Sequence, residues 1–152
     1  MKLETLTASQ AAKLLENKEV SSVELTQACL DRIELRNGEV GAFAHIDPEF
    51  SLKQAALADS EPRRSSFQGV PFGVKDVIDT KDFLTERGTP IHAGRQPVAD
   101  AKCVQLMREA GAVLLGKLVS TEYAMFTPNE TRHPLDLTRT AGGSSSGTGA
   151  AV

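Results

Sequence analysis

Apolar and polar residues alternate with the period of a helix over the first sixty positions. Thr7 with Gln10 and Ser21 with Glu24 have the spacing of a capping box, in which side-chain oxygens satisfy the free N–H groups of a first helical turn. Apolar residues then recur three and four positions apart, which indicates one buried stripe along each helix. The pattern predicts three helices: one after Thr7, one from Ser21 to a stop at Asn37–Gly38, and one over 48–59.

Beyond residue 60 the helical period gives way to short, continuous apolar runs. Segments 69–78 and 112–117 are apolar over most of their length, which predicts strands covered on both faces. Between them, 101–110 has helical spacing and is closed by Gly111. Segment 127–140 is polar and is predicted as a loop. Helix, glycine and apolar strand in this order are typical of a layered α/β fold, here with a helical N-terminus.

The composition describes an ordinary globular chain. Of the 152 residues, 40% are hydrophobic and 24% are charged, which suits one modest domain or part of a larger one. The net charge of −3, with no basic stripe, argues against nucleic acid or an anionic membrane as a partner. No apolar run approaches the roughly 20 residues of a membrane span, and no signal-peptide core is present. We therefore expect a cytoplasmic protein, with Cys29 and Cys103 as buried, reduced thiols.

The glycine- and serine-rich segment 142–149 allows four interpretations. It has the composition of a flexible linker. Its glycine spacing fits a phosphate-binding loop, but Thr148 stands where that loop needs a lysine. It also fits the nucleophile elbow G-x-S-x-G around Ser145, yet the apolar strand before the elbow and the acid and histidine after it are missing. The fourth interpretation pairs the segment with Lys75.

Lys75 interrupts the apolar run of 69–78. Burial disfavours an ammonium ion, so a lysine enclosed by apolar side chains can serve as a neutral base. A serine hydroxyl becomes a useful nucleophile only when a base removes its proton, and glycines beside serines let backbone N–H groups point inward. In the alternative interpretation, Lys75 reaches solvent or forms an ion pair with Asp76 or Asp79.

Four segments, taken together, resemble the amidase signature family. They stand in the order that the family shows: Gly69–Asp76, Ala110–Lys117, Thr121–Met125 and Gly142–Gly147. The resemblance extends from Leu6 to Val152 and implies an α/β fold with a mixed sheet covered by helices, in which residues 1–152 are the N-terminal part of one domain. It also implies amide hydrolysis by a Ser–cis-Ser–Lys triad, without a cofactor or a metal.

The resemblance assigns two residues of that triad. Lys75 corresponds to the catalytic base, and Ser144 corresponds to the bridging serine that a cis peptide bond joins to Gly143. The nucleophilic serine would lie beyond Val152. We therefore expect the chain to be a truncated piece of a longer enzyme and to be inactive by itself.

A third part of the resemblance concerns substrate binding. Met125, Phe126 and Thr127 correspond to the segment that lines the acyl pocket. Met125 and Phe126 suit a plain role in the hydrophobic core equally well. The segment is therefore a candidate for substrate binding, and a role in the hydrophobic core is the alternative.

Two functions within the family compete. A free-standing amidase would act on a small carboxamide and form a homodimer, whereas the A subunit of a tRNA-dependent amidotransferase would work with partner subunits. The chain is short between Glu122 and His133 and lacks the serine-rich stretch usual in the latter, which favours the free amidase, with a small-molecule amide as its partner. A non-catalytic remnant or interaction module is the alternative from another class.

Overall fold

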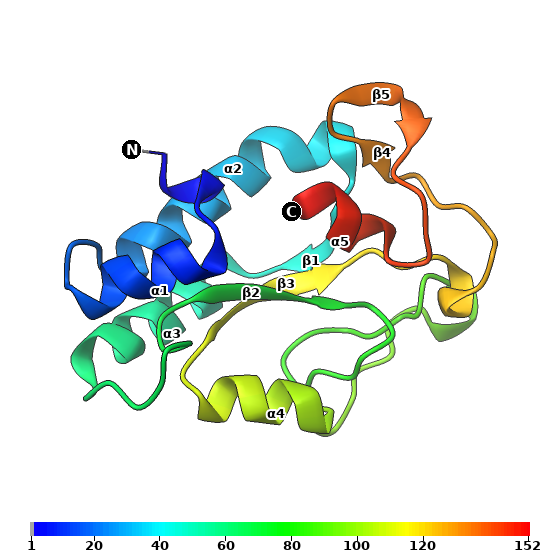
Figure 1. Ribbon diagram of the computed structural model, residues 1–152. Coiled ribbons are helices and arrows are strands. Elements are labelled where there is room, and N and C mark those ends of the chain that lie inside the picture. Colours follow the sequence, from blue (N-terminus) through cyan, green and yellow to red (C-terminus); the bar gives the residue numbers. More distant parts are fainter. Residues whose placement is uncertain (1) are drawn as a thin grey trace. The chain divides into compact units, whose positions relative to one another are not determined.

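The computed structural model describes residues 2–152 (Figure 1). These residues form two compact units, each assembled from three stretches of chain. Unit 1 comprises the chain up to Ile33 together with Asp47–Phe72 and Lys102–Leu115. Unit 2 comprises Glu34–Ile46, Gly73–Ala101 and Gly116–Val152. Both units therefore bring together residues that are distant in the sequence.

Unit 1 is mainly helical. It contains η1 (Leu3–Thr5), α1 (Ala8–Glu16), the first part of α2 (Ser22–Val40), α3 (Pro48–Ser60) and α4 (Lys102–Glu109). Both predicted capping boxes are confirmed: Thr7 and Gln10 exchange hydrogen bonds before α1, and Ser21 and Glu24 do so before α2. The helices that local sequence signals predict are therefore present.

Helix α2 continues past its predicted stop at Asn37–Gly38 and ends at Val40. A glycine inside a helix costs only about 1 kcal/mol, which tertiary contacts can offset. The Asn37 side chain accepts a hydrogen bond from the N–H of Phe43 and donates one to its carbonyl, which ties the last turn to the next strand. The chain leaves the helix at Gly41, whose positive φ of 65° suits a glycine.

A three-stranded sheet has the order β1 (Phe43–Ile46), β3 (Val113–Leu118), β2 (Pro71–Lys75). Strand β1 is antiparallel to β3, with Phe43 opposite Leu118. The hydrogen bonds from Val113 to Val70 and from Asp76 to Leu118 advance in the same direction, so β2 runs parallel to β3. All six residues of β3 are buried, as the apolar run over 112–117 predicts. The sheet is mixed, in agreement with the sequence-based expectation.

Segment 127–140, predicted as a loop, contains a small hairpin. Strands β4 (Arg132–His133) and β5 (Asp136–Thr140) pair antiparallel around Pro134. Their residues are mostly exposed, so no alternation of apolar and polar positions marks them as strands. The Arg36 guanidinium donates a hydrogen bond to the Pro134 carbonyl within unit 2, a contact that spans 98 positions and that local sequence signals do not reveal.

The prediction of two buried thiols is wrong for Cys103 and holds only in part for Cys29. Both cysteines are free; Cys29 is partly buried and Cys103 is exposed. Burial raises the pKa of the Cys29 thiol to about 11. Among residues 2–152, no helix combines the length and the apolar character that crossing a membrane requires.

Candidate active site

Lys75 and Ser144 meet within unit 2. Lys75 ends β2, and Ser144 lies just before α5 (Ser146–Ala151). The side-chain nitrogen of Lys75, Nζ, forms a hydrogen bond of 2.8 Å with Ser144 Oγ, across 69 positions of sequence. The peptide bond between Gly143 and Ser144 is cis. The structure thus places the two residues that the resemblance assigns to the triad at hydrogen-bond distance.

Lys75 is half-buried, so the expectation of an enclosed lysine does not fit this residue. Among residues 2–152, the lysine that is fully buried is Lys117, whose side chain is 0% exposed. The two carboxylates considered as partners of Lys75 are engaged elsewhere: Asp76 faces Lys117 at 3.5 Å, and Asp79 faces Arg95 at 2.7 Å. Hydrogen bonds from Arg95 hold the pKa of the Asp79 carboxyl below its usual value.

Thr121 joins Ser144 to the segment expected to line the acyl pocket. Its backbone N–H donates to the Ser144 carbonyl at 3.0 Å, and its hydroxyl donates to the Met125 carbonyl at 2.7 Å. Ser120 Oγ also reaches the Ser144 carbonyl, at 3.4 Å. The sequence places Thr121 at the start of one of the four family segments but does not reveal this role, because a threonine that binds two carbonyl groups has no sequence signature of its own.

The glycine–serine segment is anchored after Ser144 as well. The Gly147 N–H donates to the Val119 carbonyl at 2.9 Å, and Asn129 donates to Ser146 Oγ at 2.5 Å. A Cβ atom at Gly147 would lie 2.2 Å from the Ala42 carbonyl oxygen, so only glycine allows this approach of two backbones. These contacts contradict the interpretation of the segment as a flexible linker.

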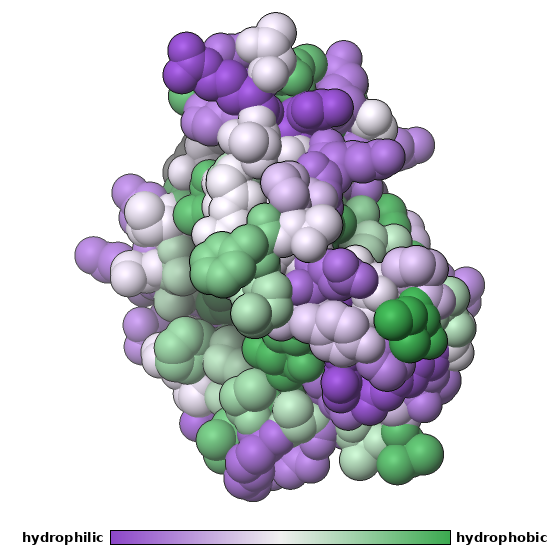
Figure 2. Space-filling view, turned by 90° about the vertical axis from the view of Figure 1, so that its right-hand side faces the viewer, coloured by the Kyte–Doolittle hydropathy of each residue, from purple (hydrophilic) through white to green (hydrophobic). Residues whose placement is uncertain are grey.

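Met125 and Phe126 are exposed within unit 2, by 58% and 92% respectively, so neither packs in the core of this unit. They follow η3 (Glu122–Ala124), where Tyr123 and Ala124 have positive φ angles of 49° and 58°. Figure 2 shows green, apolar side chains on the surface among purple, polar ones. Exposed apolar side chains next to Thr127 are compatible with substrate binding, which stays a prediction.

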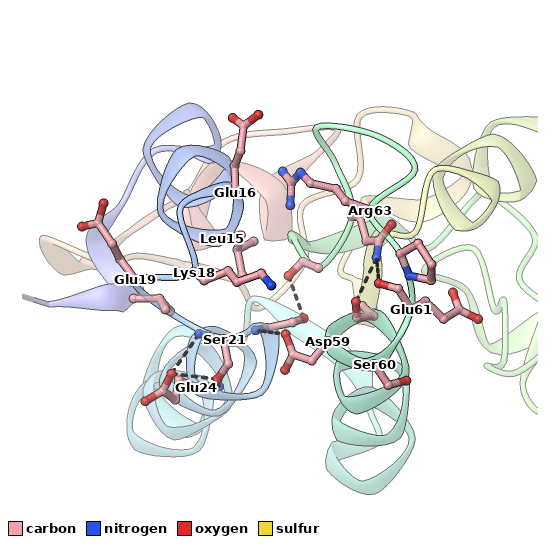
Figure 3. A pocket seen from close by; sticks show the side chains of 16 residues that line it. Leu15, Glu16, Lys18, Glu19, Ser21, Glu24, Asp59, Ser60, Glu61 and Arg63 are labelled. Atoms are coloured by element: carbon pink, nitrogen blue, oxygen red, sulfur yellow. Dashed lines mark hydrogen bonds between the residues drawn. The ribbon is translucent and has the colours of Figure 1, made fainter.

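A groove of about 670 Å³ lies in unit 1, lined by the end of α1, the start of α2, the end of α3 and the chain that follows it (Figure 3). Several of its carboxylates close helix ends. Asp59 accepts hydrogen bonds from the backbone N–H groups of Ser22 and Val23, and Glu24 accepts one from Ser21. These acidic residues therefore have structural partners, and the groove is separate in sequence and unit from Lys75 and Ser144.

Known proteins similar to this chain are amidases and components of amidotransferases. The chain is 41% identical over 160 residues to the A subunit of the glutamyl-tRNA(Gln) amidotransferase of Chloroflexus aggregans, and 40% identical over 161 residues to that of Desulfatibacillum aliphaticivorans. These alignments cover 99% and 100% of this chain but 33% of each relative. The chain therefore spans about a third of the length of the relatives that it matches.

Solved structures agree with the sequence relatives. The peptide amidase of Stenotrophomonas maltophilia is 31% identical, with a TM-score of 0.88 over 97% of this chain and 34% of its own. An amidase family protein from Bacillus anthracis is 27% identical, with a TM-score of 0.83 over 94% of this chain and 32% of its own. A model of the amidase family matches residues 24–152. On this match and on the fold, the chain belongs to the amidase family.

Proposed function

We propose that this chain supplies the base and the bridging serine of an amide-hydrolysing site in the A subunit of an amidotransferase. The observation that carries the proposal is the hydrogen bond between Lys75 Nζ and Ser144 Oγ, beside the cis peptide at Gly143, in a member of the amidase family. Residues 1–152 form the N-terminal part of one amidase domain in this proposal, and the nucleophilic serine comes from another part of the protein.

The relatives change the preference for a free amidase that sequence analysis expresses. Relatives named as A subunits of amidotransferases are 40–42% identical over nearly the whole chain, whereas the peptide amidase structure is 31% identical. Such a role implies partner subunits and a tRNA bound by the complex. The proposal therefore replaces the expectation from composition and charge that nucleic acid is not a partner. The short segment between Glu122 and His133 favours the second candidate, a free amidase for small carboxamides.

In the proposed mechanism Lys75 acts as the base. Lys75 takes the proton of the Ser144 hydroxyl while Ser144 takes the proton of the nucleophilic serine. The serine oxygen then forms a bond to the carbonyl carbon of the amide, the C–N bond breaks, and the proton held by Lys75 returns through Ser144 to the leaving ammonia. Water, activated by the same relay, cleaves the acyl-enzyme ester and releases the acid.

The hydrogen bonds of Thr121 support the assignment of the acyl pocket to Met125, Phe126 and Thr127. Because one threonine binds the carbonyl groups of both Ser144 and Met125, the pocket segment begins next to the bridging serine. In the proposed complex, the exposed apolar side chains of this segment contact the acyl part of the substrate.

The test is ammonia release by the full-length protein from primary carboxamides, including glutamine and benzamide. Lys75→Ala and Ser144→Ala should each lower kcat about 1,000-fold or more. Lys75→Arg should be equally inactive, because a guanidinium does not lose its proton at working pH. Lys81→Ala, at an exposed position of the same unit, is the matched control and should stay within twofold. A Lys75→Ala protein with activity within a few-fold of wild type would refute the proposed role.

The same assay separates the two candidate functions. An amidotransferase component should need its partner subunits for full turnover and should favour glutamine. A free amidase should hydrolyse benzamide at full rate as a single polypeptide.

A further inference from the structure

Asp76, which directly follows the proposed base in the sequence, belongs to a buried ion pair with Lys117. Lys117, in β3, is 0% exposed, and its ammonium faces the buried Asp76 carboxylate at 3.5 Å. The same ammonium donates to the Ile78 carbonyl at 2.7 Å and to the Thr85 hydroxyl at 2.5 Å. Burial lowers the pKa of the Lys117 ammonium, and the facing carboxylate offsets part of that effect. The charged form of Lys117 is therefore held by three partners in unit 2.

Stability alone does not explain this pair. Removing two charges from water costs free energy that their mutual attraction often fails to recover, and apolar residues of similar size can replace such pairs without loss of stability. Hydrogen-bonded charges, in contrast, fix the direction and distance of the groups around them.

Asp76 fixes the segment that follows it in the site. Its carboxylate accepts hydrogen bonds from the backbone N–H groups of Glu86 at 3.2 Å and Gly88 at 3.4 Å. Its carbonyl accepts a third from the Arg87 N–H at 3.0 Å. Asp76, the residue that directly follows Lys75, thus binds the backbone N–H groups of three consecutive residues, 86–88.

Residues 86–88 in turn hold the segment that binds Ser144. The Arg87 carbonyl accepts a hydrogen bond from the Tyr123 N–H at 2.9 Å. Gly88 lies so close to this segment that a Cβ atom on it would be 2.5 Å from the Ser120 carbonyl oxygen. The neighbouring Thr121 N–H donates to the Ser144 carbonyl. One continuous set of contacts therefore leads from the ion pair to Ser144.

We infer that Lys117 and Asp76 are positioning residues that keep Lys75 and Ser144 at the distance needed for proton transfer. Lys75 is held through its peptide bond to Asp76, and Ser144 is held through residues 86–88 and 120–123. The inference rests on the proposed function of Lys75 and Ser144, and neither Lys117 nor Asp76 touches the substrate in it.

The main test is Lys117→Met in the full-length protein, because methionine keeps the length of the side chain without the charge. We expect kcat to fall about 100-fold while KM changes less than threefold, since the relay and not substrate binding is disturbed. The double variant Lys117→Met/Asp76→Asn leaves no unpaired buried charge, so its melting temperature should return toward that of wild type while kcat stays at least tenfold low. Recovery of kcat together with stability would show a merely structural pair and would overturn the inference.

A crystal structure of the variant gives a readout that does not depend on activity. The distance between Lys75 Nζ and Ser144 Oγ should exceed hydrogen-bond length in Lys117→Met, or in the double variant if the single one does not fold. A retained distance near 2.8 Å overturns the inference even if the protein hydrolyses none of the amides.

Two further variants distinguish a failure of the positioning role from a failure of the proposed function. Ser51→Ala removes a fully buried hydroxyl of unit 1 that donates to the Leu114 carbonyl, and it should lower stability with kcat within twofold. Lys75→Ala tests the proposed function itself. If Lys75→Ala abolishes turnover and Lys117→Met leaves kcat unchanged, the proposed function stands and the positioning role is wrong.

Discussion

The two units bury different kinds of side chain. In unit 1 the buried side chains are mostly apolar, and within residues 2–152 the buried polar ones of this unit are neutral: Ser22, Thr26, Ser51 and Gln68. In unit 2 buried polar residues outnumber buried apolar ones and include the ion pair of Lys117 with Asp76. The comparison separates a part of the molecule built on apolar burial from a part built on directed polar contacts.

The difference has a physical consequence. Apolar burial is roughly proportional to area and tolerates small shifts of the buried groups, so it stabilises a fold without fixing atoms closely. Hydrogen bonds weaken steeply with poor angles and lengths, so a polar network fixes the groups that it joins. Mutations in unit 1 should therefore change stability more than activity, and mutations in unit 2 should do the reverse.

Among the variants that test this comparison between the units, Gly147→Ala should have the largest effect. The added methyl group meets the backbone at Ala42 and Val119, at 2.2 and 2.4 Å, and the start of α5 has to move. We expect kcat of the full-length protein to fall at least about 100-fold in the ammonia-release assay. Gly38→Ala is the control: its methyl group meets nothing within 4 Å, and it should raise the free energy of unfolding by about 0.5–1 kcal/mol.

Leu114→Ala tests the other side of the comparison. Leu114 is fully buried in unit 1, and its truncation should lower the free energy of unfolding by about 3 kcal/mol. Urea titration measures the loss, and kcat should stay within twofold at temperatures where the variant is folded. A tenfold loss of kcat in the folded variant would break the proposed separation between the units.

Thr7→Ala should have a smaller effect of the same kind. It removes the oxygen that accepts the Gln10 N–H at the start of α1, and such a loss costs about 1 kcal/mol. Ser9→Ala, in the first turn of the same helix and exposed, should leave the urea midpoint unchanged or slightly higher. Equal losses in both variants would contradict the importance of the capping box.

Asp79→Asn should give the smallest effect and concerns acid conditions. Because Arg95 lowers the pKa of Asp79 in the folded state, the pair stabilises the fold above the ordinary carboxyl pKa of about 4. This contribution disappears as the pH falls through the lowered pKa. Wild type should therefore lose more stability than Asp79→Asn between about pH 4 and pH 2 in urea titrations. Glu34→Gln, at an exposed position, should follow the wild-type curve.

Sequence signals predicted the parts of the fold that depend on neighbouring residues. The capping boxes of α1 and α2 and the fully buried, mostly apolar β3 depend on signals within a few positions, and the sequence predicts them. The hairpin of β4 and β5 was missed because its exposed strands show no alternation and because a contact between residues 36 and 134 supports it. The local period of apolar residues indicates which side chains are buried, but it does not show which distant residue each of them contacts.

Two lysines of the candidate site show the same limit of local sequence patterns. Lys75 and Lys117 each follow an apolar run, and their spacing does not reveal which of them is enclosed. The position of Ser144 as partner of Lys75 came from the resemblance to a family, and no spacing in the sequence implies it. Lys117, Asp76 and Thr121 act through contacts made only in the folded chain, so they became visible as a group only in the structure.

The two cysteines of unit 1 differ in how fast they should react with an alkylating dye. At neutral pH, Cys29, whose thiol has a pKa of about 11, carries very little thiolate, whereas Cys103 is open to solvent. A maleimide fluorophore added in stoichiometric amount should therefore attach at Cys103 first among residues 2–152. In the full-length protein, its fluorescence would follow the unfolding of unit 1 in the same sample in which ammonia release is assayed.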